Sequence, residues 1–127
     1  MNYDEIYNRL NQIKIENFIW IVYIGIIVLS FYSNKLEKDY FLFNNLLAKQ
    51  KYRKTLILIF SILLIVYFYF LKDSFDDLKN LKENDSNEKK NLIFLSFIGS
   101  LLIFISGIIF LYIAYKDEDI NVELAFN

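Results

Sequence analysis

The sequence predicts an all-α membrane protein with three transmembrane helices that run up, down and up. Of its 127 residues, 56 % are hydrophobic, and these are concentrated in three blocks. The longest block, Asn91 to Tyr115, contains no charged residue. As a helix it is about 37 Å long, more than the ~30 Å hydrocarbon core of a bilayer. The chain has no Pro and only 3 Gly, which favours long uninterrupted helices. Residues 1–127 therefore form one membrane domain.

Composition argues against several functions. The 14 basic and 15 acidic residues nearly balance, which argues against a nucleic-acid partner. Cys and His are absent, which excludes disulfides, zinc sites built from these residues and histidine acid–base catalysis. No phosphate-binding loop, nucleophile elbow or catalytic carboxylate pair is present. Asp73, Asp76 and Asp77 share a helical face, but calcium takes six to eight oxygens, so solvated charge is the better interpretation. We expect no enzymatic activity and no cofactor.

Residues 1–16 form an amphipathic N-terminal segment that leads into the first span at 17–34. Tyr3, Ile6, Leu10 and Ile13 recur at helical spacing, which predicts either a helix in the membrane interface or a continuation of the span. Asn2, followed by acidic residues, is typical of a helix N-cap. A coiled-coil seam is the alternative, but two heptads are fewer than such a seam needs.

Residues 35–54 form a basic loop with helical extensions, followed by the second span at 55–71. The loop holds six basic and two acidic residues, and Asn44-Asn45 is the predicted turn. Its basic cluster either marks membrane topology or binds anionic lipid headgroups. The cluster consists of Lys49, Lys51, Arg53 and Lys54.

Residues 72–90 form a mixed-charge helical extension and turn before the third span at 91–115. The helical pattern continues to about Lys82, and Asn84 to Asn87 is the predicted break. Asp85 and Glu88 are spaced as a capping box that opens the third helix.

The third span carries small residues in two parallel rows of period seven, which predict a helix-packing seam. Small residues allow the close approach and interhelical hydrogen bonds through which helices associate in lipid. The predicted seam comprises Ser96, Gly99, Ser100, Ser106, Gly107 and Ala114.

Residues 116–127 form an acidic C-terminal tail. From Ile120 to Phe126 apolar and polar residues alternate, which is a strand pattern, yet no second strand is available to pair with it. A frayed terminus is the main interpretation. The alternative is that Ile120–Phe126 pairs with a protein partner by edge-strand addition.

Aromatic residues near the ends of the spans are typical of the membrane interface. They are Trp20, Tyr32, Tyr67, Tyr69, Tyr112 and Tyr115. Three spans place the N-terminus and the 72–90 loop on one side, with seven Lys and Arg on each side. The first span nevertheless has more basic residues after it than before it, which predicts the N-terminus outside and the C-terminus inside.

Two classes of function follow from these features. The first is a non-catalytic structural, accessory or regulatory protein of the cell membrane, which binds lipid and either copies of itself or another membrane protein. The excess of Lys over Arg and the richness in Ile, Asn, Phe and Tyr are typical of an AT-rich bacterial genome. The second class is a homo-oligomeric pore. Three spans in a short chain resemble holins, although holins usually end in a basic tail and this chain ends in an acidic one.

Overall fold

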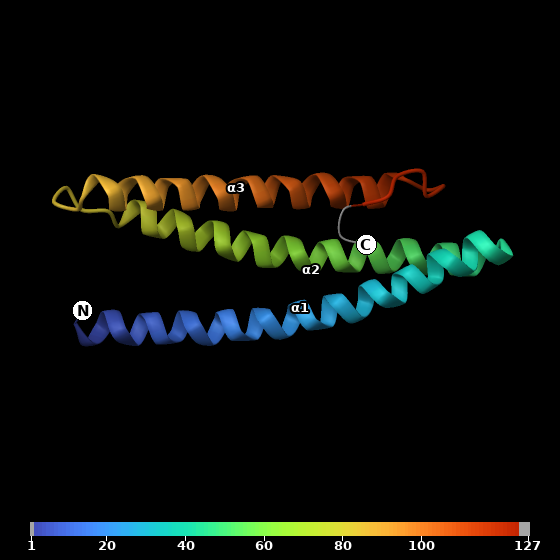
Figure 1. Ribbon diagram of the computed structural model, residues 1–127, viewed down its shortest axis with the longest axis horizontal. Coiled ribbons are helices and arrows are strands. Elements are labelled where there is room, and N and C mark those ends of the chain that lie inside the picture. Colours follow the sequence, from blue (N-terminus) through green and yellow to red (C-terminus); the bar gives the residue numbers. More distant parts are fainter. Residues whose placement is uncertain (1, 125–127) are drawn as a thin grey trace.

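The computed structural model describes residues 2–124, which form three long helices in an antiparallel array (Figure 1). They are α1 (Tyr3–Phe43), α2 (Leu46–Lys79) and α3 (Asn87–Lys116). Each helix is long and apolar enough to cross a membrane. The predicted all-α class, with three helices able to span a membrane, is confirmed.

Helix α1 runs through both the predicted N-terminal segment and the predicted first span, so from Tyr3 onward the segment continues the span rather than forming a separate helix. The side-chain oxygen of Asn2 accepts a hydrogen bond from the Glu5 N–H at 2.8 Å, which confirms the predicted cap. Toward its N-terminus α1 diverges from α2 (Figure 1). The apolar side chains of Tyr3, Ile6 and Leu10 consequently remain exposed.

The connection between α1 and α2 is the predicted turn at Asn44-Asn45. Asn44 adopts the left-handed conformation (φ 50°, ψ 39°), which Asn tolerates better than most residues. Asn45 then caps α2, because its side chain accepts a hydrogen bond from the Ala48 N–H. Two consecutive Asn residues thus end one helix and start the next.

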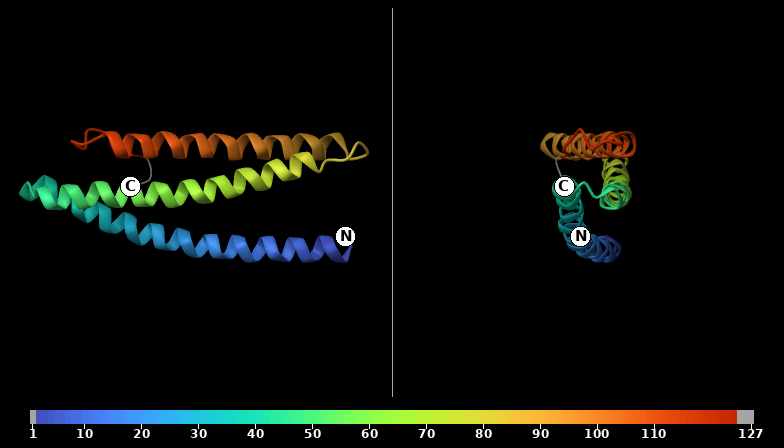
Figure 2. Two further views of the ribbon diagram at one scale, coloured as in Figure 1. Left: turned by 180° about the vertical axis from the view of Figure 1, so that it is seen from behind. Right: turned by 90° about the vertical axis from the view of Figure 1, so that its right-hand side faces the viewer.

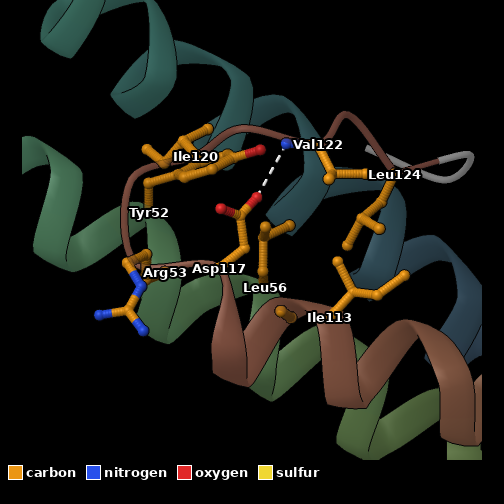
Figure 3. Close-up of a pocket in the computed structure, with 9 residues that line it drawn as sticks. Tyr52, Arg53, Leu56, Ile113, Asp117, Ile120, Val122 and Leu124 are labelled. Carbon is orange, nitrogen blue, oxygen red and sulfur yellow. Dashed lines mark hydrogen bonds between the residues drawn. The ribbon is translucent and has the colours of Figure 1, made fainter.

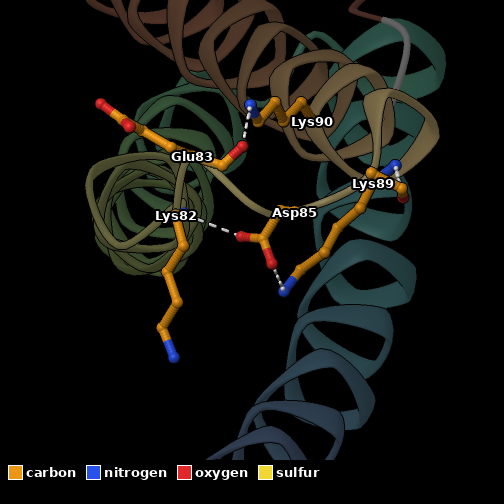
Figure 4. A network of polar contacts seen from close by, with 6 residues as sticks. Lys82, Glu83, Asp85, Lys89 and Lys90 are labelled. Atoms are coloured by element: carbon orange, nitrogen blue, oxygen red, sulfur yellow. Dashed lines mark hydrogen bonds and ion pairs between the residues drawn. The ribbon is translucent and has the colours of Figure 1, made fainter.

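The connection between α2 and α3 differs from the prediction. Helix α2 ends at Lys79, earlier than expected, and the residue that caps α3 is Ser86 rather than Asp85. The Ser86 hydroxyl accepts from the Lys89 N–H at 3.1 Å. Asp85 instead closes the loop: it accepts from the Lys82 N–H at 2.8 Å and pairs with the Lys89 ammonium at 3.2 Å (Figure 4). The predicted capping box of Asp85 and Glu88 is therefore wrong, because Ser86 is the residue that caps α3.

Helix α2 is central, and α1 and α3 pack on it without approaching each other. Seen end-on, the helices form an open angle with α2 at the corner (Figure 2). Most of the buried side chains within residues 2–124 belong to α2, including Tyr52, Ile59 and Phe60. Ring contacts such as Phe60–Phe110 and Phe68–Phe104 hold α3 against α2.

The C-terminal tail, as far as the structure describes it, folds back into this angle. The Asp117 carboxylate accepts hydrogen bonds from the Asn121 and Val122 N–H groups at 2.9 and 2.8 Å, which turns the chain (Figure 3). Leu124 is 4 % exposed and joins a cluster with residues of all three helices. The expected frayed terminus is therefore wrong up to Leu124, and the alternating pattern forms no strand in residues 2–124. Phe126 lies outside the described residues.

Candidate functional site

A groove of about 330 Å³ lies in the angle between the helices, at the end away from the tail. All three helices contribute to it, and we call it the polar groove because Ser and Asp side chains of α2 and α3 line one end of it. Its lining residues are Tyr23, Tyr67, Phe70, Asp73, Ser74, Asp77, Ser96, Ser100 and Ile103.

Two serine hydroxyls join α2 and α3 at this groove. The Oγ atoms of Ser74 and Ser100 are 2.8 Å apart and share a hydrogen bond. Ser74 is buried, so each hydroxyl supplies the partner that the other needs between two apolar helices. This bond fixes the separation of α2 and α3 where the groove opens.

Asp73 connects α1 to α2 at the same level. Its carboxylate accepts a hydrogen bond from Gln12 Nε2 at 3.1 Å, and Gln12 in turn accepts from the Arg9 guanidinium at 3.3 Å. Burial raises the pKa of the Asp73 carboxyl, as do the nearby charges of Asp77, Glu16 and Asp76, while the charge of Arg9 opposes them. Negative charge is therefore concentrated here, with one guanidinium beside it.

Polarity changes along the polar groove. Tyr23, Tyr67 and Ile103 belong to the predicted spans, whereas Asp73 and Asp77 follow the end of the second span. From Tyr67 to Asp77 the helix rises about 15 Å. One end of the groove is therefore apolar, and the other carries carboxylates that lie beyond the second span, at the level of Ser96 and Ser100 of the third.

The predicted seam on α3 divides into two sets. Ser100, Gly107 and Ala114 face α2. At Gly107 a Cβ atom would meet the Tyr67 ring at 3.0 Å and the Leu64 side chain at 3.1 Å, so any larger residue here would require these side chains to shift.

The remaining predicted seam residues do not face α2 closely. A Cβ atom at Gly99 would meet nothing within 4 Å, and the exposed Ser106 hydroxyl donates to the carbonyl of Leu102 in its own helix. Ser96 is exposed at the edge of the polar groove. The structure therefore brings the row of Ser100, Gly107 and Ala114 into contact with α2, but not the row of Gly99 and Ser106.

The predicted basic cluster is also divided. Lys49 pairs with Asp119 of the tail at 3.2 Å, which raises the pKa of the Lys49 ammonium, and lies over the Tyr40 ring. Arg53 Nη2 donates to the Tyr115 carbonyl at the end of α3. Lys51 and Lys54 are exposed. Half of the cluster therefore holds the end of α3 and the tail, and the other half is directed outward.

Four of the predicted interfacial aromatics are exposed: Trp20, Tyr32, Tyr112 and Tyr115. Trp20 packs edge-on against Tyr23, with ring centroids 5.6 Å apart. Tyr67 instead turns inward against Gly107 and lines the polar groove. Tyr69 lies between α1 and α2.

At the opposite end of the angle the tail leaves only a cavity of about 10 Å³ (Figure 3), at the lower limit for one water molecule. Ile120 and Leu124 pack there beside Tyr52 and Leu56 of α2 and Ile113 of α3. We call this the closed end, and the end with the polar groove the open end.

Sequence reasoning treated Asp73 and Asp77 as solvated charge and missed the groove. Their helical spacing placed them on one face of α2, but only the packing of α1 and α3 shows what that face meets. Within residues 2–124 no group of three or more His, Cys, Asp or Glu side chains is placed to hold a metal ion.

Comparison with protein families, curated proteins and solved structures gives no match. The fold and groove thus define a class: a small three-helix array able to span a membrane, with a polar groove between its helices.

Proposed function

We propose that this chain is a non-catalytic integral protein of a bacterial cell membrane, with a structural or accessory-regulatory role that it performs by binding. The observation that supports this most is the open angle between α1 and α3. Two helices long enough to span a bilayer flank it without touching each other, which leaves their inner faces for lipid, a second copy or another membrane protein.

The outward faces of the helices support a membrane location. Ile21 and Phe31 on α1 and Leu102 on α3 are each at least 60 % exposed. Soluble monomers rarely expose large contiguous apolar patches, whereas in a bilayer such side chains contact lipid without cost. Extraction of cell membranes at alkaline pH tests this directly: the protein is expected to remain in the membrane pellet.

The proposed orientation has the N-terminus outside, based on the basic residues that follow the first span. The chain contains no Cys, so single Cys substitutions can be probed without background. Asn87→Cys is expected to react with an impermeant maleimide on intact cells, and Asn45→Cys only after lysis. The reverse pattern would invert the topology, and labelling of both positions would indicate dual topology.

The pore alternative is tested by flux. Ser100 already shares its hydroxyl with Ser74 inside the array, which leaves it a poor lining for a channel. Liposomes that contain the pure protein are expected to retain trapped ions and dye. Reproducible release would favour the homo-oligomeric pore instead.

A further inference from the structure

We propose that the polar groove is a binding site for a zwitterionic phospholipid whose headgroup carries a primary ammonium. This inference rests on the proposed membrane location and names the ligand of the open angle. The ammonium lies between Asp73 and Asp77, the phosphate lies toward Arg9, and an acyl chain extends past Tyr67 and Ile103 into the bilayer.

The order of polarity along the groove matches the orientation of a lipid in one leaflet. The carboxylates of Asp73 and Asp77 follow the predicted second span, on the side of the groove nearer the membrane surface. Tyr67 and Ile103 lie within the spans, where acyl chains lie. Because no Cα atoms of α1 and α3 lie within 8 Å of each other, a lipid can enter the groove sideways from the bilayer.

The charges at the mouth suit a headgroup that carries both signs. Asp73 and Asp77 attract a cation, and a primary ammonium can donate hydrogen bonds to both carboxylates. The Arg9 guanidinium does not line the groove, but it is linked to Asp73 through Gln12 and so places a cation beside the carboxylates for the attached phosphate. An anionic headgroup without an amine would place its charge against the two carboxylates.

The closed end favours a lipid over a partner helix as the occupant. A transmembrane helix in the angle would have to pass the site where Ile120 and Leu124 pack, and would therefore displace the tail. A lipid occupies one leaflet, about 15 Å of hydrocarbon, and needs only the open end.

The test uses the single Trp of the chain, Trp20, whose ring contacts the groove residue Tyr23. The protein is reconstituted in phosphatidylcholine vesicles to which brominated phosphatidylethanolamine, phosphatidylcholine or phosphatidylglycerol is added, and quenching of Trp20 is measured. Lipid that merely surrounds the protein quenches equally whatever its headgroup. We expect half-maximal quenching by the ethanolamine lipid at about tenfold lower mole fraction, the factor that one charge-assisted hydrogen bond provides.

Two variants and one matched control locate the effect. Asp73→Asn and Asp77→Asn each remove one carboxylate from the groove and are expected to abolish most of the preference. Asp4→Asn removes the same charge from the first turn of α1, outside the groove, and is expected to keep it. Asp77 is exposed, so its variant tests the site even if Asp73→Asn fails to fold, which circular dichroism monitors.

Each alternative outcome overturns the proposal. Equal quenching by all three lipids would mean that only surrounding lipid is present, and a preference for phosphatidylglycerol would reverse the charge assignment. Loss of the preference in Asp4→Asn as well would remove it from the groove. Failure of the protein to float with the vesicles would refute the membrane location itself, whereas flotation without headgroup preference would refute only this site.

Discussion

The angle between α1 and α3 is filled differently at the two ends of the molecule. At both, α1 and α3 lie on either side of α2 without contacting each other. At the closed end the chain fills the angle with its own tail and leaves about 10 Å³, whereas at the open end a groove of about 330 Å³ remains, lined by Ser and Asp side chains as well as apolar ones. This difference supports our proposal that the open end serves binding, whereas the packed tail stabilises the closed end.

The chemistry of the two ends agrees with that division. The closed end is held by apolar side chains and by Asp117, each of whose carboxylate oxygens accepts a hydrogen bond from a backbone N–H group of the tail. At the open end Asp73 and Asp77 both line the groove, and no Lys side chain of residues 2–124 lines it with them. Like charges placed side by side cost free energy unless a cation joins them.

The largest expected effect is at the closed end. Leu124→Ala removes a buried side chain that the unfolded tail would expose to water, and should lower the free energy of unfolding by about 3 kcal/mol. Val122→Ala, in the same turn but about half exposed, should change it little. Thermal unfolding of the detergent-solubilised protein measures both. Equal effects would mean that the tail is not packed.

The next effect compares two glycines of α3. Gly107→Leu inserts a side chain against Tyr67 and Leu64 and should cost about 1–3 kcal/mol by overpacking. Gly99→Leu meets open space and should not destabilise. Both changes give the same gain in helix propensity, so their difference isolates packing. If both variants unfold like the parent, α3 does not contact α2 at Gly107.

A smaller effect is expected from the hydrogen bond between Ser74 and Ser100. A double-mutant cycle with Ser74→Ala and Ser100→Ala should give a coupling energy of about 0.6 kcal/mol, an average value for interhelical hydrogen bonds in membranes. Ser106→Ala, whose hydroxyl bonds only to its own helix, should show no coupling to Ser74→Ala. A coupling energy of zero for Ser74 and Ser100 would mean that no hydrogen bond joins α2 and α3 at the groove.

The smallest effect is a pH dependence of opposite sign at two carboxyls of the open end. The pKa of Asp73 is raised above 3.8 by burial, so the folded state binds its proton more tightly and stability falls as pH rises through the raised value. Backbone hydrogen bonding from Lys82 lowers the pKa of Asp85 below 3.8, so its stabilisation is lost as pH falls through the lowered value.

Asn variants separate these two contributions. Asp73→Asn should remove the decline above pH 3.8, and Asp85→Asn should remove the loss below it. Unfolding midpoints measured across this range provide the test. Both changes in the free energy of unfolding are small because solvent screens these carboxyls. Parallel pH profiles for the two variants would contradict the opposite environments of Asp73 and Asp85.

Much of the fold was predictable because it depends on local chemistry. The apolar blocks predict three helices, Asn2 predicts a cap and Asn44-Asn45 predicts a turn, and each depends on residues close together in the chain. The second connection was misjudged because Ser86 and Asp85 are neighbours that can both cap a helix. Which one does so depends on the path of the loop, where Asp85 bonds to the Lys82 N–H instead.

The sequence by itself determined that this protein is built from three long helices able to span a membrane, because hydrophobicity, helix propensity and length belong to each segment separately. Only the tertiary structure decided that Gly107 rather than Gly99 faces α2, that the tail packs as far as Leu124, and that Asp73 and Asp77 border a groove. Those outcomes depend on the rotation of each helix about its axis and on contacts between residues far apart in the chain. A periodic pattern shows which residues share a face, but not what that face meets.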